Sequence, residues 1–208
     1  MTSLISWVGT DERGNASLYL ASDSRISNNQ EKWDFGRKLF TSQKYPEIFG
    51  YCGDVLFQTQ ILGQIIQLID NDILFEPKDS HLLKTEKIFE RLNSGLETYP
   101  YQLGFEILYG TRQFSEMKSE FYLSKIAYHN RNLTSEFIDI PKEKSALIIN
   151  LGTGKKFVDN YIGKWKQSDA GSTSRIYFSA FCDSLHFGED LRSGGAPQLV
   201  GIYRNKGA

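Results

Sequence analysis

The sequence predicts an α+β protein, a four-layer αββα sandwich in which two stacked antiparallel sheets are covered on the outside by pairs of helices. Strand-like and helix-like segments occur in blocks along the chain: strands, two helices, strands, two helices and a closing strand. Strands that occur in blocks favour antiparallel pairing, and each helix pair must bury its apolar face against a sheet. Two sheets stacked face to face with helices outside meet both requirements.

Four short runs rich in β-branched and aromatic residues predict the first strands. These runs cover residues 4–8, 17–22, 38–41 and 47–52. The turn-forming residues Asp11, Gly14 and Asn15 separate the first two runs and predict a hairpin at the start of the chain. Gly53 ends the second pair.

Apolar residues at helical spacing predict four helices, which come in two pairs. They cover residues 54–70, 80–96, 156–166 and 172–185. Asp54 is expected to be the N-cap of the first helix, because its carboxylate can accept a hydrogen bond from the first turn. Between and after the helix pairs, alternating segments predict strands at residues 104–110, 119–128, 135–138, 146–150 and 198–204.

The composition is that of one soluble domain covering residues 1–208, with 24% charged and 40% hydrophobic residues. A net charge of −1 offers no field for a nucleic-acid backbone, so we expect no nucleic-acid partner. No segment reaches the roughly 20 apolar residues of a membrane span, and the start lacks a signal peptide, so a cytoplasmic protein without membrane association is expected. Scattered histidines and two distant cysteines predict neither a metal nor a cofactor.

Six local features carry the chemistry, and each of them alone is common. They are Thr2 and the segments 21–25 (ASDSR), 37–40 (RKLF), 51–54 (YCGD), 151–154 (LGTG) and 190–195 (DLRSGG). In this order, and with the helices between them, they resemble the proteasome β-type and HslV-like subunits of the N-terminal-nucleophile (Ntn) hydrolase superfamily. The resemblance covers nearly the whole chain and implies the Ntn-hydrolase fold.

The resemblance makes Thr2 the nucleophile after removal of Met1, which a small second residue permits. A threonine hydroxyl needs a base to accept its proton, and the α-amine of the same residue can do so directly or through a water. The unperturbed pKa of an α-amine is about 7.7–8.0, so it can act as base and then as acid near neutral pH. Nucleophile and base are thus expected in one residue.

The resemblance assigns three further roles close to the nucleophile. Lys38 supplies an ammonium that favours the neutral amine and stabilises negative charge on the threonine oxygen. Asp23 anchors that lysine by a charge-assisted hydrogen bond. The backbone N–H of Gly53 binds the oxyanion, where the missing side chain lets the substrate approach and the following helix adds positive potential.

Three polar residues near the end of the chain match positions that surround the threonine amine in the family. They are Thr153, Asp190 and Ser193. Thr153 departs from the usual serine but keeps the hydroxyl. The residues matching the substrate pocket are Gly36, Tyr51 and Val55. Because Tyr51 is larger than the residue often found at the pocket base, we expect a shallow pocket that prefers small side chains.

Together these assignments predict a threonine-type endopeptidase subunit that assembles into a homo-oligomeric ring or double ring and cleaves proteins or peptides inside it. An ATP-dependent unfoldase is a further partner that the resemblance allows. Two alternatives stay open. One is a small-molecule amidohydrolase on the same fold, and the other is a catalytically silent scaffold subunit.

Overall fold

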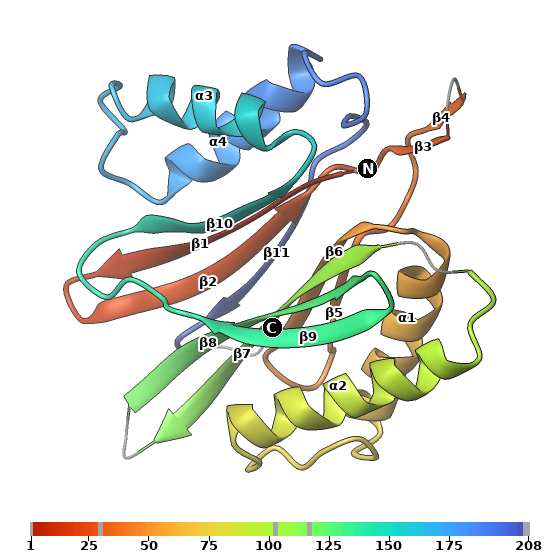
Figure 1. Ribbon diagram of the computed structural model, residues 1–208. Helices are drawn as coiled ribbons and strands as arrows, with labels where there is room; N and C mark the ends of the chain where they lie inside the picture. Colours follow the sequence, from red (N-terminus) through yellow and green to blue (C-terminus); the bar gives the residue numbers. More distant parts are fainter. Residues whose placement is uncertain (1, 29–30, 102–103, 116–117, 206–208) are drawn as a thin grey trace.

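A computed structural model describes residues 2–28, 31–101, 104–115 and 118–205 of the chain. It contains antiparallel sheets and four helices, so the predicted α+β class is confirmed. The strands and helices follow the predicted block order (Figure 1). Among the described residues, no helix combines the length and apolar character required to span a membrane.

The first sheet has four strands in the order β10-β1-β2-β11, and all its pairs are antiparallel. Its strands are β1 (Ser3–Asp11), β2 (Gly14–Ser22), β10 (Ala146–Gly152) and β11 (Gln198–Tyr203). Ser3 pairs with Gly152, and Leu4 pairs with Ser22. The start of β1 therefore lies between the end of β10 and the end of β2.

The second sheet has five antiparallel strands in sequential order, from β5 to β9. They are β5 (Leu39–Thr41), β6 (Glu47–Gly53), β7 (Phe105–Ser115), β8 (Lys118–His129) and β9 (Asn132–Ile138). A small separate hairpin precedes β5 and consists of β3 (Ile26–Asn28) and β4 (Glu31–Trp33). The sequence pattern did not predict this hairpin, because it is short and mostly exposed and so has no alternation of buried and exposed residues.

The helices form two pairs on opposite sides of the sheets (Figure 1). They are α1 (Leu56–Asp70), α2 (His81–Glu97), α3 (Lys155–Trp165) and α4 (Arg175–His186). Amphipathic sequence explains their positions, because each helix turns its buried residues toward a sheet. One apolar cluster joins α1 and α2 to the five-stranded sheet, and another joins α3 and α4 to β1 and β2.

A third apolar cluster lies between the two sheets and includes Leu4, Leu20 and Leu108. At Gly50 of β6, an added Cβ would lie 2.8 Å from a methyl group of Leu4 and 2.9 Å from one of Leu39. A side chain at this position would therefore displace the leucine side chains that pack between β6 and β1. This contact holds the beginning of β1 against the second sheet.

The first helix begins slightly later than the sequence predicted. Val55, not Asp54, occupies the N-cap of α1, and Val55 has no side-chain capping bond. The carboxylate of Asp54 nevertheless accepts a hydrogen bond from the backbone N–H of Phe57 at 3.3 Å. Asp54 thus satisfies a first-turn donor from one position before the cap, as the capping argument requires.

Candidate active site

Asp23 follows β2, Lys38 precedes β5, and the chain brings their side chains together in the interior. The Lys38 Nζ donates to Asp23 Oδ1 at 2.8 Å, and both side chains are 0% exposed. The same Oδ1 accepts the backbone N–H of Ser3 at 3.1 Å. Asp23 Oδ2 accepts the backbone N–H groups of Gly194 at 3.0 Å and Arg25 at 3.3 Å. One carboxylate therefore binds the start of β1, the Lys38 ammonium and a distant loop.

Burial is the largest influence on the pKa of both charged groups. It raises the pKa of Asp23 and lowers the pKa of Lys38, while the attraction between their charges opposes each shift. The backbone N–H groups of Gly194 and Ser3 also favour the carboxylate form of Asp23. Because a buried charge without a partner is costly, the charge of each residue favours the charged form of the other.

Thr2 lies directly before β1 and is 1% exposed. Its carbonyl oxygen accepts the backbone N–H of Thr153 at 3.1 Å. Its Oγ1 is buried and has no hydrogen-bond partner within the described part of the chain. Gly152 has a φ of +87°, and an added Cβ there would collide with the Thr2 carbonyl, so this position requires glycine. The backbone of Thr2 is thus fixed while its hydroxyl is left unpaired.

A chain of hydroxyl groups leads from the start of β1 to Asp190. Asp190 Oδ2 accepts the hydroxyl of Ser193 at 2.7 Å and that of Thr153 at 3.0 Å. The Ser193 Oγ also lies 2.8 Å from the Oγ of Ser3. The structure therefore brings Thr153, Asp190 and Ser193 together, and it joins them to the residue that follows Thr2.

Gly53 and two of the expected pocket residues, Tyr51 and Val55, lie around the junction of β6 and α1. Gly53 has a φ of +107°, and an added Cβ would lie 2.5 Å from the carbonyl oxygen of Gly104. Tyr51 is fully buried, and its hydroxyl donates to the Arg37 carbonyl at 3.3 Å. Val55 packs at the edge of the apolar cluster beneath α1.

Gly36 lies on the Lys38 side of this region. Its N–H donates to the Ser24 carbonyl at 2.8 Å, and its own carbonyl accepts the Gln198 amide at 2.6 Å. The other end of that amide accepts the backbone N–H of Lys38 at 3.1 Å. Gln198 thus fixes the segment that carries Lys38 against the first residue of β11.

Several solved structures are similar to this chain over nearly its whole length. HslV from Trypanosoma brucei is 13% identical with a TM-score of 0.57, and the match covers 97% of this chain and 99% of that one. BPH from Thiobacillus denitrificans is 12% identical with a TM-score of 0.60, covering 98% and 99% of the two chains. The same protein in complex with epoxomicin gives 13% and 0.57, covering 99% and 100%.

The chain has the HslV and proteasome β-type fold. The predicted resemblance is confirmed at this level. No family model matches the sequence, and a search of curated proteins finds no relative. Since identity to the solved structures is only 12–13%, the HslV-type fold says where a site would lie and leaves its activity to be argued from the residues.

Three residues of this candidate site have no role assigned from the sequence. They are Ser3, Arg25 and Gln198, and each of them contacts at least one segment that is far away along the chain. The Arg25 carbonyl accepts a hydrogen bond from Lys38 Nζ at 2.5 Å, and its guanidinium binds Asp34 at 2.7 and 2.9 Å. Of these three residues, only Arg25 lies in a motif that the resemblance uses, the ASDSR segment.

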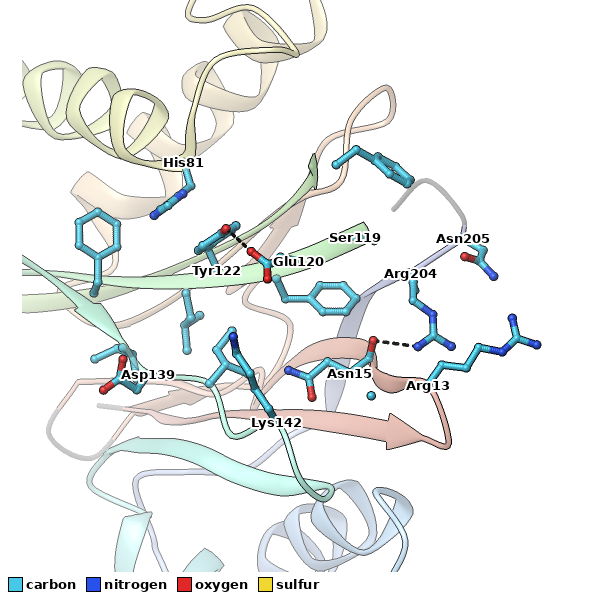
Figure 2. A pocket seen from close by; sticks show the side chains of 17 residues that line it. Arg13, Asn15, His81, Ser119, Glu120, Tyr122, Asp139, Lys142, Arg204 and Asn205 are labelled. Carbon is cyan, nitrogen blue, oxygen red and sulfur yellow. Dashed lines mark hydrogen bonds between the residues drawn. The ribbon is translucent and has the colours of Figure 1, made fainter. Parts of the chain in front are cut away.

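A separate cavity of about 900 Å³ opens at the other end of the first hairpin (Figure 2). The turn between β1 and β2 contributes Arg13 and Asn15, and β8 contributes Glu120 and Tyr122. None of the site residues expected from the sequence lines this cavity. It is therefore distinct from the region around Thr2.

Proposed function

We propose that this chain is a threonine-type endopeptidase subunit of a self-compartmentalising protease, with Thr2 as the nucleophile once Met1 has been removed. Met1 lies outside the described residues. One observation carries the proposal: the Lys38 ammonium and the backbone N–H of Ser3, the residue after Thr2, both donate to the same oxygen of Asp23. The HslV-type fold and the epoxomicin complex of the Thiobacillus denitrificans protein support the same chemistry.

Lys38 is suited to assist the Thr2 hydroxyl. An ammonium carries three N–H donors, and two of those on Lys38 have acceptors in the described residues, Asp23 Oδ1 and the Arg25 carbonyl. The third is available for Thr2 Oγ1, which is buried without a partner in the same part of the chain. Such a donor stabilises negative charge as the hydroxyl loses its proton to the α-amine.

The reaction then follows the order of an acyl transfer. The Thr2 oxygen attacks the carbonyl carbon of the scissile amide, and the backbone N–H of Gly53 stabilises the resulting oxyanion. The α-amine, now an ammonium, donates its proton to the leaving amine. Water then attacks the ester carbonyl of the acyl-enzyme. The α-amine accepts the proton of the water and returns it to the Thr2 oxygen, which releases the acid product.

Thr153, Asp190 and Ser193 are proposed to orient the α-amine. Asp190 Oδ2 accepts the hydroxyl groups of Thr153 and Ser193, which fixes the orientation of its side chain. The carboxylate and the hydroxyl oxygens are proposed to accept hydrogen bonds from the amine and so to define its direction. The amine would therefore be presented to the Thr2 hydroxyl in a fixed orientation.

The substrate pocket is proposed to lie between Gly36, Tyr51 and Val55. The Tyr51 ring is packed in the core and its hydroxyl is bound to the Arg37 carbonyl, so it fills the base of this region. A filled base supports a shallow pocket that accepts small side chains. Substrates with alanine or glycine before the scissile bond are the first to test.

The assembly is part of the same proposal. We infer one domain over residues 1–208 in a four-layer αββα arrangement, cytoplasmic, and assembled into a homo-oligomeric ring or double ring that encloses the sites. An ATP-dependent unfoldase would deliver folded proteins to such a chamber. The HslV-type fold supports the ring, because the family that this chain resembles consists of subunits of compartmentalised peptidases.

A catalytically silent subunit is the second candidate, and one observation favours it. Thr2 is 1% exposed, so its hydroxyl is not accessible to a substrate carbonyl in this structure. Removal of Met1 would have to open this region for the enzyme proposal to hold. N-terminal sequencing of the protein purified from its source distinguishes the two, since a retained methionine supports the silent subunit.

The proposal is tested by turnover on fluorogenic peptides and on small amide substrates, with the native mass measured on the same preparation. Peptide cleavage by an assembly of several subunits that is lost in Thr2→Ala supports the proposal. Cleavage of small amides alone would indicate an amidohydrolase. A monomer of a single mass would contradict the compartment while leaving hydrolysis to be judged separately.

A further inference from the structure

Ser3 is a buried polar residue for which the sequence predicts no function. It is 1% exposed, and its Oγ lies 2.8 Å from the Oγ of Ser193. Ser193 has one hydroxyl hydrogen, which it donates to Asp190 Oδ2 at 2.7 Å. Because that hydrogen is used, Ser3 must be the donor in its bond to Ser193. The hydrogen bonds therefore point in one direction, from Ser3 through Ser193 to Asp190.

The surroundings of Ser3 leave it little freedom. Its N–H donates to Asp23 Oδ1 at 3.1 Å, and its carbonyl accepts the Asp23 N–H at 3.3 Å. An added Cβ at Gly154 would collide with the Ser3 Oγ and lie 3.0 Å from the Ser193 Oγ. The glycine at 154 thus leaves the space through which the two hydroxyl groups meet.

Asp190 and Ser193 lie in residues 187–197, which belong to no helix or strand. A segment of this kind depends on hydrogen bonds to its neighbours. The Gly194 carbonyl accepts the backbone N–H groups of Ser24 and Arg25 at 3.2 and 3.0 Å, and side chains add further anchors. Two such anchors come from Asp23 and Arg25, which bind Gly194 and the Ser193 carbonyl at 3.0 and 3.3 Å. A further anchor comes from Ser3, which lies next to Thr2 in the chain and reaches the segment through the Ser193 hydroxyl.

We propose that Ser3 is a positioning residue, which ties Ser193 and Asp190 to the strand that begins at Thr2 and so sets the direction of the Thr2 amine. The inference rests on the proposed function, since the amine acts only if Thr2 is the nucleophile. Ser3 does not contact the reacting atoms in this scheme. It acts through Ser193, which gives its role a distinct experimental signature.

The first test compares Ser3→Ala with Ser6→Ala. Ser6 is a fully buried serine on the same strand, and its Oγ has no partner among the described residues, so it controls for the loss of one buried hydroxyl. We expect Ser3→Ala to lower kcat about tenfold with little change in KM, since positioning affects the chemical step. Ser6→Ala should keep the wild-type kcat. An unchanged kcat in Ser3→Ala would overturn the proposal.

A double-mutant cycle tests whether Ser3 acts through Ser193. If it does, the variant carrying both Ser3→Ala and Ser193→Ala is no slower than Ser193→Ala alone. Independent, multiplying losses would overturn the inference even if each variant were slow. Should Ser3→Ala fail to fold, Ser3→Cys keeps the volume with a much weaker donor, and a wild-type kcat in that variant would also overturn it.

These outcomes are distinguishable from a failure of the proposed function. If wild-type protein with a processed start hydrolyses nothing, the proposed function is wrong, and the positioning role of Ser3, which depends on it, is overturned with it. If the wild type is active and Thr2→Ala is not, the function holds. The Ser3 and Ser193 variants then decide the positioning role on its own.

Discussion

Lys38 Nζ and Asp23 Oδ1 lie 2.8 Å apart, and neither side chain has any exposed surface. Removal of one partner therefore leaves the other as an unpaired charge in the interior, which costs about 3–5 kcal/mol of folding free energy. We expect Lys38→Ala to lose this much stability in urea unfolding. We also expect it to lose hydrolysis by on the order of 10²- to 10³-fold, because the donor to the threonine oxygen is gone.

A second buried pair in the same protein provides the control for this variant. Lys84 Nζ lies 2.7 Å from Glu47 Oε1, with side chains 2% and 0% exposed, beneath α2 and outside the proposed site. Lys84→Ala should destabilise the fold about as much as Lys38→Ala, yet its folded fraction should keep the wild-type kcat. Equal losses of kcat in both variants would show that Lys38 acts only through stability.

Thr2→Ala should abolish hydrolysis and leave the stability almost unchanged. The Thr2 Oγ1 has no hydrogen-bond partner within the described part of the chain, so its removal sacrifices no bond and should change the unfolding free energy by less than about 1 kcal/mol. Thr2→Ser keeps the hydroxyl and should retain measurable turnover. Wild-type turnover in Thr2→Ala would exclude this residue as the nucleophile.

Gly152 is expected to tolerate no side chain. Its φ of +87° and the collision of an added Cβ with the Thr2 carbonyl predict that Gly152→Ala loses roughly 1–3 kcal/mol and displaces Thr2. Gly163 in α3 is the matched control, since an added Cβ there meets nothing within 4 Å among the described residues. Gly163→Ala should gain roughly 0.5–1 kcal/mol and keep full activity. A stable, active Gly152→Ala would contradict the account of this turn.

Cys52 should be unreactive toward thiol reagents in the folded protein. Burial, with Glu106 close by, raises the pKa of its thiol to about 12, so very little of the reactive thiolate is present near neutral pH. At pH 8 we expect iodoacetamide to modify the half-buried Cys182 first, and Cys52 only after unfolding, as read by mass mapping. Rapid modification of native Cys52 would show that this part of β6 opens readily.

The order of strands and helices could be predicted because it depends on local periodicity. The helical spacing of Ile61, Ile65 and Ile69 and the alternation in β6 and β8 each come from a face buried against one neighbour. The β3–β4 hairpin was missed because Glu31–Trp33 is exposed and has no buried face to reveal it. The cap at Val55 was misplaced by one residue because the Asp54 carboxylate can reach the same turn from either position.

The individual site residues could be proposed from motifs, but their connections could not. Asp23 and Lys38 are 15 residues apart, and the resemblance predicts both of them because each lies in one of its motifs. The bond between Ser3 and Ser193 spans 190 residues, and that between Lys38 and Gln198 spans 160. No local pattern encodes which serine or glutamine a folded chain will place opposite another, so only the assembled sheets reveal these partners.

The most direct test of the central claim is mass mapping of a covalent adduct on the processed protein. Epoxomicin, which is bound in the Thiobacillus denitrificans structure, is the first electrophile to use. We predict an N-terminal peptide that starts at Thr2 and carries one adduct on that residue, with no adduct in Lys38→Ala under the same conditions. A chain that keeps Met1, or an adduct on any residue other than Thr2, would contradict the account.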